Sequence, residues 1–348
     1  MTADSTTQAA PPATDSPKVD PQKTRKQLEY KHTRPLTACH WESRGRYVFF
    51  GAEDNLVHRF DVAAKTVVEL AGHDSWVRAM GTTPDGELLV TGGYDGRLVW
   101  WPTAAEKPTP IRTVEAHAGW VRSLAIGHHG RWVATCGNDR LIKLWDVAQG
   151  TLLATLTGHK SHVYNVAFGK DDLTLVSCDL KGTVLTWPLD PAKPVDAVGS
   201  EVATVQALHF YDTTFRADIG GARSIALRSD GNQWALGGIT NVTNAFAGVG
   251  EIAVALVNVV EKKVDQLLQS KEKTQGAVWG VVHHPDGFWM GLSGGGGGWV
   301  HFWKGDANHE FFKFKLPSDG RGLGVSPDRR QFAVAHADNH LRTYSLHE

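Results

Sequence analysis

The chain has 348 residues, and its 36 basic and 37 acidic side chains give a formal net charge of −1. This balance excludes a global electrostatic attraction to nucleic acid or to an anionic membrane surface. Hydrophobic residues make up 41% of the chain, but no apolar run approaches the roughly 18 residues of a membrane span. Three scattered cysteines, Cys39, Cys136 and Cys178, exclude a disulfide framework and are typical of buried free thiols in a cytoplasmic protein.

The first 23 residues are predicted to form a disordered tail. They are rich in Thr, Ala, Pro, Ser and Asp, lack aromatic residues, and contain neither the basic nor the apolar region of a signal peptide. A strand-like segment, RKQLEYKH at residues 25–32, comes next. We expect residues 24–348 to form one domain of a cytoplasmic protein.

From residue 35 onward the sequence repeats a unit of short strands. In the unit that begins at His117 and ends at Asp146, the segments VRSLAI, RWVATC and LIKLWD alternate as strands do, and the turns HHG and GND separate them. In the first four units, histidines recur about 40 residues apart, and each of these units ends with an aromatic residue. The pattern predicts seven units that start near residues 35, 76, 120, 162, 221, 277 and 320.

These repeats resemble the WD-repeat family of β-propellers. The resemblance rests on the period of about 40 residues, on Gly-His pairs that precede units, and on the Trp-Asp pair that ends the third. It implies four strands per blade, with the blades arranged radially. We therefore expect an all-β fold, a single seven-bladed β-propeller of four-stranded antiparallel blades.

The two ends of the chain predict how the ring closes. The last unit ends with its third strand, LRTYSL at residues 341–346, so its blade lacks an outer strand. An unpaired strand edge promotes aggregation, and pairing with residues 25–32 would cover that edge. We expect the N-terminal strand to pair with the last blade and close the propeller.

Units two and three share a set of polar residues at the same offsets from their final Trp. A buried relay explains the set, because the Trp indole N–H can meet the Thr hydroxyl, the hydroxyl the His ring, and the His the Asp. The family resemblance implies the same structural tetrad. Its members here are His73, Thr91, Asp95 and Trp101 in unit two, and His117, Thr135, Asp139 and Trp145 in unit three.

The tetrad is incomplete elsewhere. Unit four keeps the His, the hydroxyl and the Trp but has Lys181 where the Asp is expected, and unit one has Phe50 and Phe60 in place of the hydroxyl and the Trp. A His, an Asp and a hydroxyl within reach of each other also suggest catalysis. A set that occurs twice in adjacent units favours a structural role, so we expect no catalytic residue, cofactor or metal.

The relay also predicts a candidate binding surface. It requires the loop that carries the His and the turn that carries the Asp to lie at the same end of each blade. On that face, the position five residues after the His marks the mouth of the central channel. The residues aligned there are Thr37, Arg78, Arg122, Tyr164, Arg223, Trp279 and Arg321, with Trp76, Tyr94 and Trp120 beside them.

Guanidinium groups with aromatic neighbours suit an anionic ligand and are common in protein-binding hot spots. We expect this rim to bind a protein or peptide, and an acidic sequence in that partner would suit the positive charge of the rim. The alternative is that the arginines pair with nearby Asp residues and only hold the rim in shape. An insertion at 239–251, a long link at 210–221 and a glycine run at 293–298 enlarge the same face.

The function predicted from these features is a non-catalytic scaffold that mediates protein–protein interaction through one propeller face. WD-repeat proteins typically serve as scaffolds, and the sequence shows no nucleophile elbow, convergent carboxylate pair or metal cluster. Two alternatives remain open. One is a propeller enzyme with a site at the channel mouth, and the other is a protein that binds single-stranded nucleic acid by stacking and positive charge.

Overall fold

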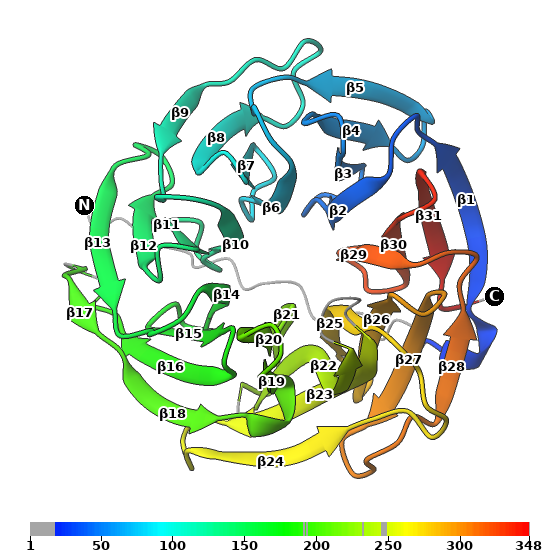
Figure 1. Cartoon of the computed structure of the whole chain (residues 1–348). Helices are drawn as coiled ribbons and strands as arrows, with labels where there is room; N and C mark the ends of the chain where they lie inside the picture. Colours follow the sequence, from blue (N-terminus) through cyan, green and yellow to red (C-terminus); the bar gives the residue numbers. More distant parts are fainter. Residues whose placement is uncertain (1–17, 191, 193, 232, 245–248, 348) are drawn as a thin grey trace, which may run out of the picture.

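The computed structural model describes residues 18–190, 192, 194–231, 233–244 and 249–347. These residues form seven radial sheets around a central channel, with the first strand of each blade innermost (Figure 1). The strands of each four-stranded blade run antiparallel, so the predicted all-β, seven-bladed propeller is confirmed. Within the described ranges, no helix combines the length and the apolar character needed to cross a membrane.

The first four blades begin where the repeats predict. The first contains β2 (Leu36–Trp41), β3 (Tyr47–Ala52), β4 (Val57–Asp61) and β5 (Thr66–Leu70). The second contains β6 (Val77–Thr82), β7 (Leu88–Gly93), β8 (Arg97–Pro102) and β9 (Arg112–Glu115). The third contains β10 (Val121–Ile126), β11 (Trp132–Gly137), β12 (Ile142–Asp146) and β13 (Leu152–Thr157), with β17 (Ala197–Val198) added in parallel at its edge. The fourth contains β14 (Val163–Phe168), β15 (Thr174–Asp179), β16 (Thr183–Pro188) and β18 (Ser200–Thr204).

The remaining blades follow a short 3-10 helix, η2 (Gln206–Leu208), and a separate hairpin of β19 (His209–Asp212) and β20 (Ala217–Gly220). The fifth blade contains β21 (Ser224–Leu227), β22 (Trp234–Asn244), β23 (Val249–Asn258) and β24 (Lys263–Leu268). The sixth contains β25 (Ala277–His284), β26 (Phe288–Gly294), β27 (Trp299–Lys304) and β28 (Phe312–Lys315). The seventh contains β29 (Gly320–Val325), β30 (Gln331–His336), β31 (His340–Ser345) and the N-terminal β1 (Arg25–Lys31).

Hydrophobic residues fill the space between adjacent blades. Both faces of an inner strand contact a neighbouring blade, and all six residues of β11 are buried for this reason. One core cluster joins Val90 of the second blade to Val121 and Val133 of the third. The three cysteines are buried and free, as predicted, and burial raises the pKa of the Cys39 and Cys178 thiols to about 12. Such thiols serve as small apolar core residues.

The N-terminal strand closes the ring, as predicted from the chain ends. β1 pairs antiparallel with β31, and Figure 1 shows the two strands side by side in blue and red. Across this pair Arg342 Nε donates to Glu29 Oε2 at 2.6 Å, and both terminal nitrogens of Arg342 donate to the Asp338 carboxylate at 2.9 Å. Because Arg342 is buried, these bonds satisfy a charge that would be costly without partners.

The described chain begins inside the segment predicted as a tail. The backbone N–H of Val19 donates to Asp286 Oδ2 at 2.8 Å, and that of Asp20 donates to the Leu346 carbonyl at 2.9 Å. The 3-10 helix η1 (Pro21–Lys23) follows, and the Val19 side chain packs against the core of the sixth and seventh blades. Residues 19–23 therefore belong to the packed propeller, which corrects the predicted boundary, while residues 1–17 lie outside the described residues.

The closure contacts predict a loss of stability in acid. Hydrogen bonds from Arg342 and Lys26 lower the pKa of Glu29 from 4.5 to about 2. A carboxyl whose pKa is lowered by folding stabilises the folded state above its unfolded pKa, and this contribution disappears as the pH falls from about 4.5 to about 2. Burial lowers the pKa of His336, in the same blade, to about 4, so stability also falls as the pH drops from about 6.5 to 4.

We therefore expect the thermal unfolding midpoint to decrease below about pH 6.5 and to decrease further below about pH 4.5. Differential scanning calorimetry over this range measures both steps. In Glu29→Gln the second step should be smaller than in the unmodified protein, because the amide cannot titrate. An equal second step in both proteins would contradict the role given to Glu29.

Candidate functional site at the channel mouth

The hydrogen-bond relays of the second and third blades are present in the predicted order. In the second blade Trp101 Nε1 donates to Thr91 Oγ1 at 2.9 Å, Thr91 Oγ1 lies 2.8 Å from His73 Nε2, and His73 Nδ1 lies 2.9 Å from Asp95 Oδ2. The corresponding distances in the third blade are 2.9, 2.8 and 2.9 Å. Each relay ties a His-bearing loop to an Asp-bearing turn, so these loops lie at the same end of their blades.

The fourth blade corrects the prediction that it lacks an acidic partner. Asp179 Oδ2, at the end of β15, lies 3.1 Å from His159 Nδ1, and Ser177 Oγ lies 2.6 Å from His159 Nε2. The carboxylate thus belongs to the residue two positions before Lys181, whereas the repeat pattern predicts it at position 181 itself. The relay ends at the hydroxyl, because Trp187 Nε1 is buried without a hydrogen-bond partner among the described residues.

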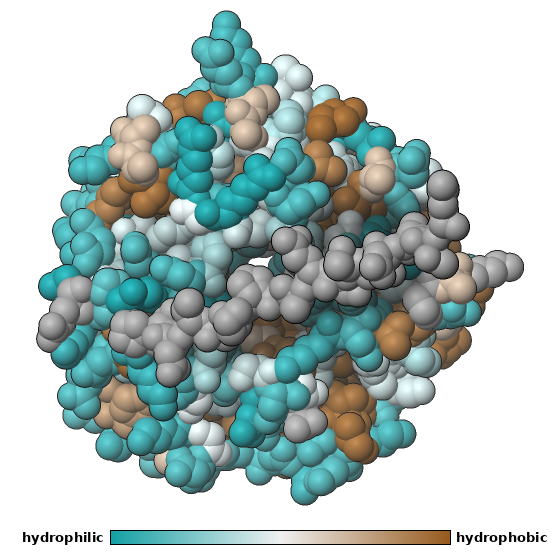
Figure 2. Space-filling model, turned by 180° about the vertical axis from the view of Figure 1, so that it is seen from behind, coloured by the Kyte–Doolittle hydropathy of each residue, from teal (hydrophilic) through white to brown (hydrophobic). Residues whose placement is uncertain are grey.

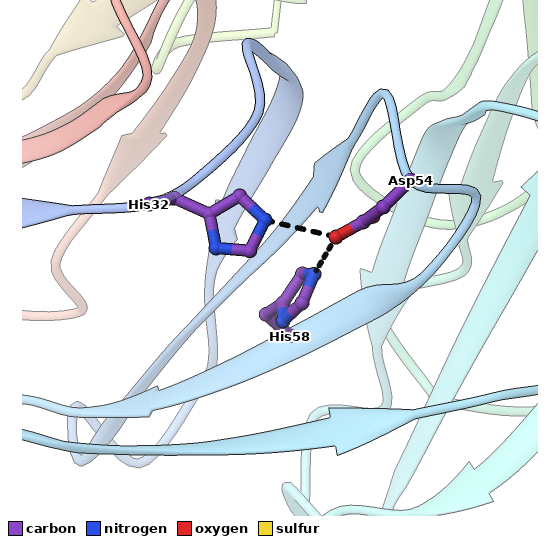
Figure 3. Close-up of side chains that lie close together, drawn as sticks. All are labelled: His32, Asp54 and His58. Carbon is purple, nitrogen blue, oxygen red and sulfur yellow. Dashed lines mark hydrogen bonds and ion pairs between the residues drawn. The ribbon is translucent and has the colours of Figure 1, made fainter.

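A cluster of His32, Asp54 and His58 replaces the relay in the first blade (Figure 3). The Nε2 atoms of His32 and His58 lie 2.8 and 3.1 Å from the same Asp54 oxygen. Burial opposes ionisation of Asp54, but hydrogen bonds from His58, the Leu56 N–H and His32 hold its pKa well below the usual range.

These three residues are a group of metal-ligating types within reach of one another in the described chain. A metal bound by both Nε2 atoms would place the proton of each neutral ring on Nδ1. His58 Nδ1 is buried without a partner, whereas a metal-bound His normally donates from its second nitrogen to an acceptor. The cluster therefore fits a hydrogen-bonded triad better than a metal site.

Six of the seven aligned ring residues line the central channel, which encloses about 730 Å³. The exception is Thr37, which is buried and donates its hydroxyl to the Val77 carbonyl at 2.6 Å. It belongs to the contact between the first two blades. Figure 2 shows the disc from the side opposite to Figure 1, with an opening at its centre. The residues that line the channel as predicted are Arg78, Arg122, Tyr164, Arg223, Trp279 and Arg321.

Arginine and aromatic side chains alternate across the mouth in a continuous row, which we name the cation–π chain. It links the second blade to the sixth across the channel and then returns through the fifth, fourth and third. Such contacts contribute about 0.5–1 kcal/mol each when exposed and more when desolvated. In order, its members are Arg78, Trp279, Arg223, Tyr164, Arg122 and Trp120, and successive distances from guanidinium carbon to ring centre are 4.7, 5.6, 4.4, 4.6 and 4.5 Å.

Three of the four arginines have no carboxylate partner among the described residues. Arg321 Nη1 donates to Glu53 Oε1 at 2.7 Å, but no ion pair involves Arg78, Arg122 or Arg223 in that part of the chain. Burial, together with the charges of Arg223 and Arg321, lowers the pKa of Arg78. The Nε atom of Arg223 is buried without a hydrogen-bond partner in the described residues. The alternative in which Asp residues neutralise the ring therefore does not describe these three arginines.

A stack of aromatic rings, here called the aromatic shelf, adjoins the cation–π chain and consists of Trp76, Tyr94 and Trp120. The rings of Tyr94 and Trp120 are stacked, with centroids 4.1 Å apart and planes at 4°, and the Trp76 ring lies 6.4 Å from Tyr94. The two tryptophans are 40% and 41% exposed. The neighbouring Arg122 is held by Asn138, whose Oδ1 accepts from its Nε at 2.7 Å. The shelf therefore offers accessible apolar area next to positive charge.

Two hairpins stand beside the mouth next to Trp279. The 239–251 insertion lengthens β22 and β23, so its described part is strand, and residues 245–248 lie outside the described residues. The 210–221 link supplies the β19–β20 hairpin. Ile239 and Val242 of the first hairpin pack with Ile219 of the second and with Trp279.

The glycine run at 293–298 allows neighbouring backbones to approach closely. Gly298 has φ +67°, and a Cβ atom there would lie 2.1 Å from the Ser318 carbonyl oxygen, so only glycine fits. The Gly297 N–H donates to Asp319 Oδ1 at 2.7 Å, which joins this turn to the loop that enters the seventh blade. The run is thus part of the face that carries the mouth.

Comparison with known proteins identifies part of the chain. The family described as "WD domain, G-beta repeat" matches residues 64–102, 108–146 and 150–187. The chain is similar to Protein HIR1 of Cryptococcus neoformans var. neoformans serotype D, with 30% identity over 137 residues, 32% of this chain and 16% of that protein. It is also similar to Nuclear distribution protein PAC1 of Arthroderma otae, with 28% identity over 177 residues, 44% of this chain and 38% of PAC1. The match thus spans less than half of either relative.

Proposed function

Because this chain is a WD-repeat β-propeller, we propose that it is a non-catalytic, cytoplasmic scaffold that binds a protein partner through the cation–π chain and the aromatic shelf. The observation that carries the proposal is a pair of exposed tryptophans that both contact Tyr94, beside arginines that lack carboxylate partners in the described chain. Trp, Tyr and Arg dominate binding energy at protein interfaces, because they combine large apolar area with directed hydrogen bonds. Because the relays already fix the loops that carry these residues, binding costs little conformational entropy.

The two alternative functions have less support. Acid–base catalysis needs a free carboxylate or another general base in the channel, and both Glu42, which lines it, and Glu53 are engaged. Glu42 accepts from backbone N–H groups of the β2–β3 turn, and Glu53 is paired with Arg321. Single-stranded nucleic acid would use the same stacking rings and positive charges, so a direct binding measurement has to separate it from a protein partner.

The test replaces side chains of the proposed binding surface and leaves the fold intact. Replacing Arg78, Arg122 and Arg321 together by Ala, or Trp76 and Trp120 together by Ala, should each weaken capture of a co-purifying partner by at least about thirty-fold, since hot-spot truncations cost 2 kcal/mol or more. Quantitative pull-down with the purified partner measures the loss. Labelled oligothymidine in a fluorescence polarisation assay measures the nucleic-acid alternative.

Leu152→Ala provides a matched control, because Leu152 is an exposed apolar residue on the outer strand β13, far from the mouth. This variant should bind the partner like the unmodified protein. Partner binding that survives both surface variants, with unchanged circular dichroism, would exclude this face as the interface.

A further inference from the structure

The mouth of the channel carries more positive charge than the described residues neutralise. Four guanidinium groups line it, and within the described part of the chain they form one ion pair, that between Arg321 and Glu53 at 2.7 Å. A cation held in a partly buried position without a counter-charge raises the free energy of the folded protein. An anion placed between these groups would lower it.

Two arginines that have no carboxylate partner in the described chain, Arg78 and Arg223, lie near one another at the mouth. Arg78 and Arg223 contact the same ring, that of Trp279, at 4.7 and 5.6 Å, although they come from the second and fifth blades. Arg78 Nη2 donates to the backbone carbonyl of Arg321 at 3.3 Å, which ties Arg78 to the first strand of the seventh blade. Arg223 Nε is buried and has no acceptor among the described residues, so one directed donor is already desolvated and unused.

We propose that Arg78 and Arg223, beside the Arg321–Glu53 pair, form an anion subsite that receives a Glu or Asp side chain from an extended acidic segment of the partner. This inference rests on the proposed function and specifies the chemistry of the partner. The planar guanidinium fork matches a carboxylate, and a carboxylate already binds one guanidinium of the mouth, since Arg321 Nη1 donates to Glu53 Oε1 at 2.7 Å.

A peptide segment fits the surroundings better than a free anion. The exposed aromatic shelf continues from the subsite through Arg122 and offers apolar area for the residues that flank the inserted side chain. The channel below, with a volume of about 730 Å³, accepts the side chain without displacing the strands. The two hairpins pack against Trp279, the ring that both Arg78 and Arg223 contact.

The experiment titrates the full-length protein with a fluorescently labelled hexaglutamate peptide, acetylated and amidated at its ends, and follows polarisation. Hexaglutamine is the matched control, since its side chains have the same shape without the charge. Hexaglutamate should bind and hexaglutamine should not, and hexaglutamate affinity should fall as NaCl is raised. Arg223→Met should weaken hexaglutamate binding about thirty-fold or more, and Arg223→Lys, which keeps the charge without the fork, should weaken it less.

Arg44→Met serves as the protein control, because Arg44 lies in the β2–β3 turn at the opposite end of the blade and should not affect binding. Equal binding of the two peptides, or unchanged binding in Arg223→Met, overturns the subsite. If replacing Trp76 and Trp120 still weakens binding of the purified partner in that case, the proposed function stands without the anion subsite. Tighter binding of hexaphosphoserine or oligothymidine than of hexaglutamate overturns the choice of a carboxylate ligand.

Discussion

Replacing Thr91 by Val should lower the free energy of unfolding by about 2–6 kcal/mol, because the hydroxyl serves two buried partners at once. Trp101 Nε1 donates to it at 2.9 Å, and His73 Nε2 lies 2.8 Å from it on the other side. Valine keeps the shape of the side chain and leaves both partners unsatisfied, at about 1–3 kcal/mol each. Urea denaturation followed by both circular dichroism and tryptophan fluorescence measures the change.

The fourth blade supplies the comparison. Ser177 Oγ lies 2.6 Å from His159 Nε2, but Trp187 Nε1 already lacks a hydrogen-bond partner among the described residues. Ser177→Ala therefore leaves one new unsatisfied group and should cost about 1–3 kcal/mol. In a Trp101→Phe background, Thr91→Val should likewise lose about half of its effect. Equal costs for Thr91→Val and Ser177→Ala would contradict a bridging role for the Thr91 hydroxyl.

Removing residues 1–32 should abolish the folded monomer, because the seventh blade then loses its outer strand. The lost ladder joins six residue pairs of β1 and β31, and at about 1 kcal/mol for each hydrogen bond its removal approaches the total stability of a typical domain. Arg342 also loses its bond to Glu29, and an unpaired edge is exposed. Size-exclusion chromatography with light scattering should show aggregates instead of a monodisperse species.

A truncation of residues 1–17 is the matched control, since composition predicts a tail there, and its thermal midpoint should equal that of the full chain. A synthetic peptide of residues 18–32, added to the shorter protein during refolding, should restore part of the monodisperse species. A protein without residues 1–32 that unfolds at the same temperature as the full chain would show that the closure strand is dispensable.

Several features of the fold and the site follow from the sequence because they depend on local periodicity. The repeat of about 40 residues predicts the blades, and fixed offsets within a unit predict both complete relays and the ring positions. A residue at a given offset occupies the same place in every blade, so Arg78 and Arg223 could be placed at the mouth before any contact was known. The extra N-terminal strand and the missing outer strand of the last unit likewise predict the closure.

Contacts between distant residues could not be predicted in this way. Asp179 reaches His159 from a strand end rather than from the turn, and Trp303 Nε1 donates to the Gln269 carbonyl at 2.8 Å where a hydroxyl would be expected. In the seventh blade, His336 Nε2 lies 3.2 Å from the Tyr344 hydroxyl. The repeats without a complete relay thus satisfy some of their buried polar groups by substitutes that no offset encodes, whereas Trp187 Nε1 has no partner among the described residues.

The sequence by itself determined the blade count, the order of the strands, the two full relays and six of the seven rim residues, because each is set by spacing within a unit. The tertiary structure alone decided which of those residues meet. Arg78 crosses the channel to Trp279, and Arg321 pairs with Glu53. In the described part of the chain, the other rim arginines stack on aromatic rings and form no ion pair with a carboxylate. The physical reason is that these partners belong to different blades, so their distances depend on the closed ring and not on separation along the chain.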